Sequence, residues 1–271
     1  MKSFPAFGIM LKSPARRDEL RTLLQENSGL PGPRGNLELA HSFASAVAAM
    51  RLEDWQWGFL TEMAATSISK APVNSPKEFI AFCGVLALGA LYAGGLPRPR
   101  RRAALAALKE AASDRRWRVR EASAQGLQLV GEKDPAALKE IIDGWLPQSS
   151  LLEKRAIMAA LAHPPLLGDA QFALYSLETA HAVVTAVSRL DAKTRKDEAF
   201  KILRQGLGYA LSVFVAASPG EGFALLRKIA AVRDSDMAWV IRENLKKKRL
   251  SDPFPKEVEQ VSLILEESNS K

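Results

Sequence analysis

Apolar residues recur at helical spacing along most of the chain. In the stretch from Ser113 to Val130, residues Val119, Ala122, Gly126 and Val130 form one stripe at i, i+3, i+7 and i+11. Small and aliphatic residues at this spacing are typical of a helix that packs closely on its neighbours. The arginine and glutamine side chains of the stretch stay off the stripe. The segment therefore predicts an amphipathic helix with one buried face.

The same pattern predicts helices along the whole chain and no strand. Alanine and leucine dominate, and runs of β-branched residues are scarce, which favours helix over sheet. Breaks rich in proline and glycine separate the helices. The predicted helices cover roughly 15–26, 36–50, 54–67, 79–96, 99–112, 115–131, 134–146, 150–162, 168–190, 192–217, 220–232, 236–249 and 256–267.

The segment 79–96 is uncharged and reaches the length range of a membrane span, and a basic sequence follows it. It holds four glycines and four alanines, which allow close packing of the helix on both sides. We therefore predict a buried helix that ends at Gly94 and Gly95. A membrane-spanning segment is the alternative.

A second pattern is an aspartate followed six positions later by an arginine. It occurs as Asp114 and Arg120 and again as Asp236 and Arg242, and each copy holds a tryptophan three positions before the arginine. The pattern resembles the HEAT repeat, a pair of antiparallel helices joined by a turn. The resemblance implies an all-α fold, a right-handed α-solenoid of antiparallel helical hairpins. Residues 1–97 would form a less regular helical region, and residues 98–271 the HEAT-like repeats with a C-terminal capping helix.

In HEAT repeats the aspartate lies in the turn, and the arginine opens the second helix. Their side chains form a hydrogen-bonded ladder between successive repeats, because a carboxylate accepts from free N–H groups and an arginine can bridge to the next repeat. A degraded third copy follows 35 residues after Arg120. The resemblance implies a structural ladder of Asp114, Arg120, Arg155, Asp236 and Arg242.

The formal net charge of +8 is concentrated in two segments. Residues 98–120 contribute +7 and residues 242–249 contribute +4, which leaves −3 for the rest of the chain. Positive charge concentrated around two similar turns predicts a basic concave surface that binds an acidic protein or a phosphate backbone. A solvated basic face is the alternative, and the tryptophans could instead fill seams between repeats. The candidate contact residues are Arg98, Arg100, Arg101, Arg102, Arg115, Arg116, Trp117, Arg118, Trp239, Lys246, Lys247, Lys248 and Arg249.

Catalytic motifs are scarce in the sequence. The three histidines lie far apart, and Cys83 lies in the most apolar segment, where an inert buried thiol is expected. No spacing indicates a metal or cofactor site. A single cysteine, together with an N-terminus that lacks a convincing cleavage site, favours a cytoplasmic protein.

The leading functional hypothesis is a non-enzymatic HEAT-like scaffold that binds a macromolecular partner, protein or nucleic acid. The sequence around Trp117, followed by a helical pair and the segment 154–161, is also similar to the bacterial alkylpurine DNA glycosylases built from HEAT-like repeats. That resemblance implies DNA binding and gives the alternative, a DNA repair protein. It does not extend to a catalytic aspartate, because Asp114 is already explained as a turn residue.

Overall fold

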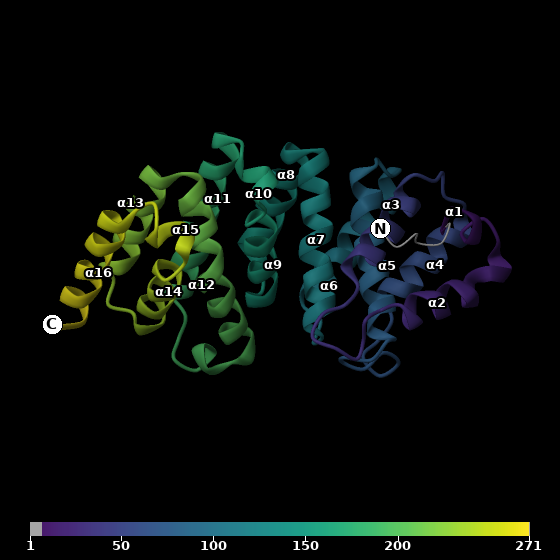
Figure 1. Cartoon of the computed structure of the whole chain (residues 1–271), viewed down its shortest axis with the longest axis horizontal. Helices are drawn as coiled ribbons and strands as arrows, with labels where there is room; N and C mark the ends of the chain where they lie inside the picture. Colours follow the sequence, from purple (N-terminus) through teal and green to yellow (C-terminus); the bar gives the residue numbers. More distant parts are fainter. Residues whose placement is uncertain (1–6, 271) are drawn as a thin grey trace. The chain divides into compact units, whose positions relative to one another are not determined.

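The computed structural model describes residues 7–270, with side chains up to residue 268. Over this range the chain forms helices α1 to α16 and three short 3-10 helices, with no strand (Figure 1). The predicted all-α class is confirmed. The chain divides into two compact units, unit 1 up to Ile141 and unit 2 from Ile142.

The helices of unit 1 pack around α5. Helix α5 contacts α3, α4, α6 and α7, and α6 also contacts α4 and α7. The sequence predicts a boundary at residue 97. Helices α6 and α7 lie after this residue in the chain, and they pack on α5 within unit 1. The helices are α1 (Phe7–Met10), α2 (Arg17–Glu26), α3 (Leu37–Ala48), α4 (Asp54–Ala64), α5 (Glu78–Ala93), α6 (Arg98–Ala112) and α7 (Trp117–Lys133), with α8 (Pro135–Trp145) containing the division between the units.

Helix α5 is buried on all sides. Every residue from Glu78 to Tyr92 is buried, and the helix ends at Ala93, after which Gly95 adopts a positive φ of 92°. The predicted buried helix that ends at the glycine pair is therefore confirmed. None of the helices in the described part of the chain combines the length and apolar character that a membrane crossing requires.

Glycines let the backbones of neighbouring helices approach α5 closely. A Cβ added to Gly84 would lie 2.4 Å from the backbone nitrogen of Ala64 in α4. A Cβ added to Gly89 would lie 2.4 Å from Cα of Gly126 in α7. These positions tolerate only glycine without movement of a backbone, so the two contacts fix how α5 meets α4 and α7.

Unit 2 is built around α12, the longest helix of the chain. Helices α9, α12 and α14 pack side by side, and α11 and α13 contact α12 and each other. The C-terminal helix α16 packs on α13, and its role as the cap of a solenoid stays a prediction. The helices are α9 (Leu151–Leu161), α10 (Pro164–Leu167), α11 (Ala170–Ser188), α12 (Glu198–Ala217), α13 (Pro219–Ala230), α14 (Ser235–Leu245), α15 (Lys248–Ser251) and α16 (Pro255–Ser270).

The helix starts follow local capping signals, with one correction. Asn36 caps α3 as predicted, because its side chain accepts from the backbone N–H of Leu39 at 3.1 Å. Asp236 was expected in the turn before the last HEAT-like helix, and it lies inside α14 instead. The capping residue is Asp234, which accepts from the backbone N–H groups of Asp236 at 3.0 Å and Met237 at 3.1 Å.

We expect Gly89→Ala to lower the free energy of unfolding by about 1–3 kcal/mol, the usual cost of overpacking a core. The added methyl group would force α5 and α7 apart at Gly126. Gly58→Ala in α4 is the matched control, because its Cβ would meet nothing within 4 Å. The control should be about 1 kcal/mol more stable than the wild type, since alanine favours helix. Urea denaturation measures both values, and an unchanged midpoint for Gly89→Ala would contradict the close contact.

Candidate binding surfaces

The turn before α7 is held together by Asp114 and Arg116. The carboxylate of Asp114 accepts from the backbone N–H of Arg116 at 2.7 Å and from its Nε and Nη2 at 2.9 and 2.7 Å. Burial raises the pKa of the Asp114 carboxyl, but the hydrogen bonds and charge of Arg116 outweigh burial, so this pKa lies below its ordinary value. The Asp114 carboxylate therefore stays ionised at neutral pH.

Arg116 is buried, with 2% of its surface exposed. Its Nη2 donates to the carbonyl oxygen of Thr66 at 2.8 Å, and its Nη1 donates to that of Ala71 at 3.3 Å. Both acceptors belong to the loop between α4 and α5. The prediction that Arg116 contacts a ligand at the surface is wrong, because its guanidinium satisfies the carbonyls of this loop.

Arg118 is also buried and also binds within unit 1. It forms an ion pair of 3.2 Å with Glu78, the fully buried first residue of α5. Its Nη2 donates to the carbonyl oxygen of Gly32 at 2.6 Å and to the side chain of Asn74 at 3.2 Å. The predicted surface role of Arg118 is likewise wrong, because this arginine neutralises Glu78 and joins two loops to α5.

Arg120 supports the same turn from the other side. Its Nη1 donates to the carbonyl oxygens of Asp114 at 2.7 Å and Arg115 at 3.0 Å. Asp114 and Arg120 therefore act within one turn, and the ladder between successive repeats stays a prediction. The carboxylate itself pairs with Arg116, two positions along the chain, which the pattern did not predict.

The corresponding turn in unit 2 uses different partners. The carboxylate of Asp236 pairs with Arg195 at 3.1 Å and with Arg204 of α12. Asp234 pairs with Arg195 at 2.7 Å. Arg242 is exposed on α14, so its predicted place in the ladder is wrong. Arg155 lies against α12, where a Cβ added to Gly206 would be 3.2 Å from its Cγ.

The basic segment at the start of α6 is partly engaged within unit 1. Arg100 donates to the carbonyl oxygen of Leu52 at 3.2 Å and forms an ion pair with Asp54. The guanidinium of Arg101 lies 4.7 Å from the ring centre of Tyr92. The side chains that are exposed in this segment are Arg98, Arg101 and Arg102.

The predicted patch over residues 98–118 is not one continuous surface. Helix α6 has 15 residues, so it spans about 22 Å at 1.5 Å per residue. Arg98 and Arg102 begin this helix, whereas Arg115 and Trp117 follow its end and remain exposed. The exposed charges therefore form two separate groups within unit 1.

The two tryptophans of the repeated pattern have different environments. Trp117 opens α7 with 46% of its surface exposed, and the guanidinium of Arg118 lies 4.6 Å from its ring. Trp239 is half-buried and packs on α12, where a Cβ added to Gly208 would be 3.1 Å from its ring. The guanidinium of Arg204 lies 4.7 Å from the ring of Trp239. Trp239 therefore fills the seam between α12 and α14, and Trp117 stays accessible.

The second basic segment surrounds Tyr209, an aromatic residue of α12 with 51% of its surface exposed. Nη2 of Arg249 donates to the Tyr209 hydroxyl at 3.1 Å, and its guanidinium lies 4.8 Å from the ring centre. The ammonium of Lys247 lies 5.9 Å from the same ring. We call Tyr209, Lys247, Lys248 and Arg249 the Tyr209 surface.

Lys246 belongs to the same basic segment but has a local partner. Its ammonium forms an ion pair of 2.6 Å with Glu243, and the hydrogen bond from Lys246 lowers the pKa of the Glu243 carboxyl. Tyr209 was missed by sequence reasoning. The signal for it is its place off the stripe of Leu203, Leu207 and Leu211, which are fully buried.

Cys83 is buried in α5, as predicted, and burial raises the pKa of its thiol well above the ordinary value. Such a thiol stays protonated at neutral pH and is a poor nucleophile. Over residues 7–270, no group of three or more histidine, cysteine, aspartate and glutamate side chains is arranged to hold a metal ion.

Comparisons with protein-family models and with curated proteins find no match to this chain. The similarity to HEAT repeats and to alkylpurine DNA glycosylases therefore stays a prediction. The functional argument rests on the geometry of the surfaces described above.

We expect Asp114→Asn to destabilise the protein by about 1.5–3 kcal/mol at pH 7, the range for hydrogen bonds to charged groups. Because the pKa of Asp114 is lowered in the folded state, its contribution is present above the unfolded pKa of about 3.9 and is lost as pH falls through the folded value. The stability difference from wild type should therefore shrink in acid. Denaturation at pH 7 and pH 3 measures it, with the 93% exposed Asp18 as control in Asp18→Asn. A difference that is independent of pH would contradict the ionised pair.

Proposed function

We propose that the protein is a non-enzymatic α-helical scaffold that binds nucleic acid through the Tyr209 surface. In architecture it would be a right-handed solenoid of HEAT-like hairpins. The packing of helices supports this architecture, because α5 contacts both α3 and α7 in unit 1, and α12 contacts both α9 and α14 in unit 2. Helical repeats stack on their neighbours and expose equivalent positions on one side.

The observation that carries the proposal is an exposed aromatic ring among cations. The Tyr209 ring is half exposed, and Arg249 and Lys247 lie within 6 Å of it. Proteins that bind single strands combine aromatic side chains, on which bases stack, with cations that contact phosphates. An acidic protein surface would need the cations but would gain less from the ring, so nucleic acid is favoured.

The ion pairs of the acidic residues in and beside the repeated pattern favour a binding function over catalysis. Asp114, Asp234 and Asp236 each pair with an arginine that holds a turn or joins two helices. These carboxylates already have structural roles. The exposed side chains of the basic segments, by contrast, are the ones available to a partner.

The two basic segments lie in different units, at 98–118 in unit 1 and at 246–249 in unit 2. The proposal concerns the second segment. Joint action of both segments on one ligand stays a prediction from the charge pattern.

We expect the full-length protein to bind a fluorescein-labelled oligothymidine of about 20 nucleotides in fluorescence anisotropy at low salt. For a single strand, the slope of log affinity against log salt is about −0.7 for each phosphate neutralised. Lys247→Glu/Arg249→Glu should lower affinity at least tenfold and reduce the magnitude of the slope by about 1.4, from two lost contacts. Tyr209→Leu should weaken binding by about 1–3 kcal/mol with the slope unchanged, because stacking carries no charge.

Lys193→Glu/Lys196→Glu is the matched control, because it reverses two exposed lysines of unit 2 outside the Tyr209 surface. It should keep most of the wild-type affinity, and circular dichroism should show equal helix content in every variant. Absence of saturable binding at low salt, or equal losses in both double variants, would contradict the proposal. An acidic protein partner lost only on reversal of Lys247 and Arg249 would replace nucleic acid as the ligand.

A further inference from the structure

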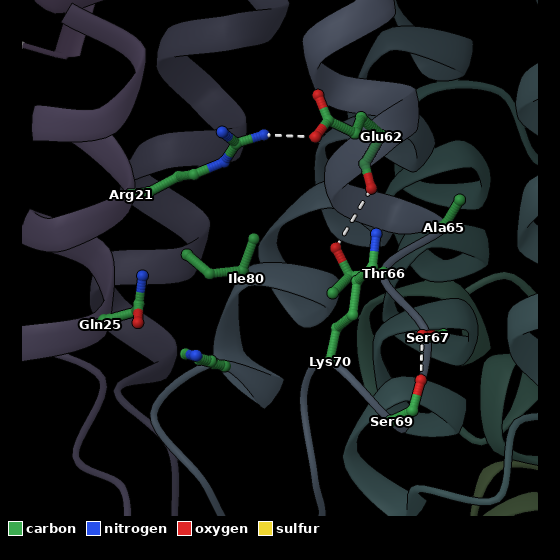
Figure 2. A pocket seen from close by; sticks show the side chains of 10 residues that line it. Arg21, Gln25, Glu62, Ala65, Thr66, Ser67, Ser69, Lys70 and Ile80 are labelled. Atoms are coloured by element: carbon green, nitrogen blue, oxygen red, sulfur yellow. Dashed lines mark hydrogen bonds and ion pairs between the residues drawn. The ribbon is translucent and has the colours of Figure 1, made fainter.

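Unit 1 contains a cavity of about 630 Å³ far from the Tyr209 surface in the sequence. Its walls come from α2, the end of α4, the loop between α4 and α5, and the start of α5 (Figure 2). This volume lies in the range of small-molecule sites, which is roughly 300–1,000 Å³. Sequence analysis did not predict the cavity, since its loop residues show no periodic pattern.

The walls combine polar groups with apolar surface. Figure 2 shows Thr66, Ser67 and Ser69 along the loop, with Gln25 opposite them on α2 and Ile80 between. The hydroxyls of Ser67 and Ser69 lie 2.8 Å apart in a hydrogen bond. Such a lining offers donors and acceptors to a polar ligand and apolar contacts at Ala65 and Ile80.

The charge of the cavity is positive. Among its lining residues Glu62 is the acidic one, and it pairs with Arg21 at 2.8 Å. Lys70 and Lys77, which both lie in the loop between α4 and α5, add two positive charges. In Figure 2 the side chain of Lys70 extends beside Thr66 towards the end of α4. The cavity therefore suits a dianion.

Arg116 holds the loop between α4 and α5, which carries these side chains, in place. This buried guanidinium donates to the carbonyl oxygens of Thr66 and Ala71, which bracket the segment from Ser67 to Lys70. Removing an arginine from water is costly unless it is fully paired, and here Asp114 supplies the counter-charge. The buried ion pair of Arg116 and Asp114 therefore holds this surface loop in one conformation.

The far end of the loop is fixed by a second buried pair. The carboxylate of Glu78 accepts from the backbone N–H of Asn74 at 2.7 Å and pairs with Arg118. Lys77 directly precedes this anchored glutamate. Both lysines therefore stand next to restrained backbone, and a restrained site loses little entropy when a ligand binds.

We propose that this cavity is a binding site for a small phosphate ester. Lys70 and Lys77 supply the positive charge that attracts the phosphate, because a lysine ammonium serves phosphate as a point charge. The organic part contacts the hydroxyls of Ser67 and Ser69 and the side chain of Ile80. The site belongs to unit 1 and is independent of the nucleic-acid proposal for unit 2.

The test is isothermal titration of the full-length protein with glycerol 3-phosphate, with inorganic phosphate, and with glycerol, all at one ionic strength. We expect saturable binding of one glycerol 3-phosphate, weaker binding of phosphate, and no binding of glycerol. Lys70→Ala/Lys77→Ala should weaken the binding of both anions at least tenfold. Both lysines are exposed, so this variant should fold.

Two control variants assign the binding to this cavity. Lys12→Ala/Lys133→Ala removes two exposed lysines of unit 1 outside the cavity, and Lys247→Glu/Arg249→Glu removes the charges of the Tyr209 surface. Both should keep the wild-type affinity for glycerol 3-phosphate. Absence of saturable phosphate binding by the wild type overturns the proposal. So does equal affinity in the Lys70/Lys77 variant, or loss confined to the Lys247/Arg249 variant.

Discussion

The burial of helix α5 is the constraint on which unit 1 depends. A helix buried on every face has no solvent side for a charge or for a bulky contact. Glycines at 84 and 89 let α4 and α7 approach its backbone, and Arg118 neutralises Glu78 at its first turn. Each large apolar side chain buried in this way contributes about 1.5–3 kcal/mol. The packing of helices around α5, and the loops that Arg118 and Arg116 hold, follow from this one requirement.

Much of the fold could be predicted from the sequence, because helical periodicity and capping are local. The buried helix predicted within the segment 79–96 is observed as α5 (Glu78–Ala93), and the predicted cap at Asn36 is observed as well. The register of the last turn could not be predicted reliably. Asp234 and Asp236 both precede an apolar stripe, and only the backbone conformation decides which one accepts from the free N–H groups. The coincidence of aspartate, tryptophan and arginine spacing favoured the wrong one.

The candidate sites were less predictable, because they depend on contacts between distant segments. Charge placed Arg116 on the predicted surface, yet its acceptors at Thr66 and Ala71 lie about 50 residues earlier in the chain. No local sequence pattern predicts such partners. For the same reason the cavity in unit 1 could not be predicted, because its serines and lysines resemble those of any solvated loop. Arg116 and Arg118 next to Asp114 bind loop carbonyls of unit 1 and are not available at its surface.

Hydrogen–deuterium exchange of the full-length protein tests the central claim, that unit 1 is built around α5, most directly. Amides that exchange only through global unfolding are the slowest in a protein, whereas exposed elements open locally. The backbone amides of α5 should therefore be among the slowest of unit 1, and those of α2, which is exposed along much of its length, should exchange faster. If the α5 amides exchange as fast as those of α2, the helix opens locally, and the account of unit 1 given above is contradicted.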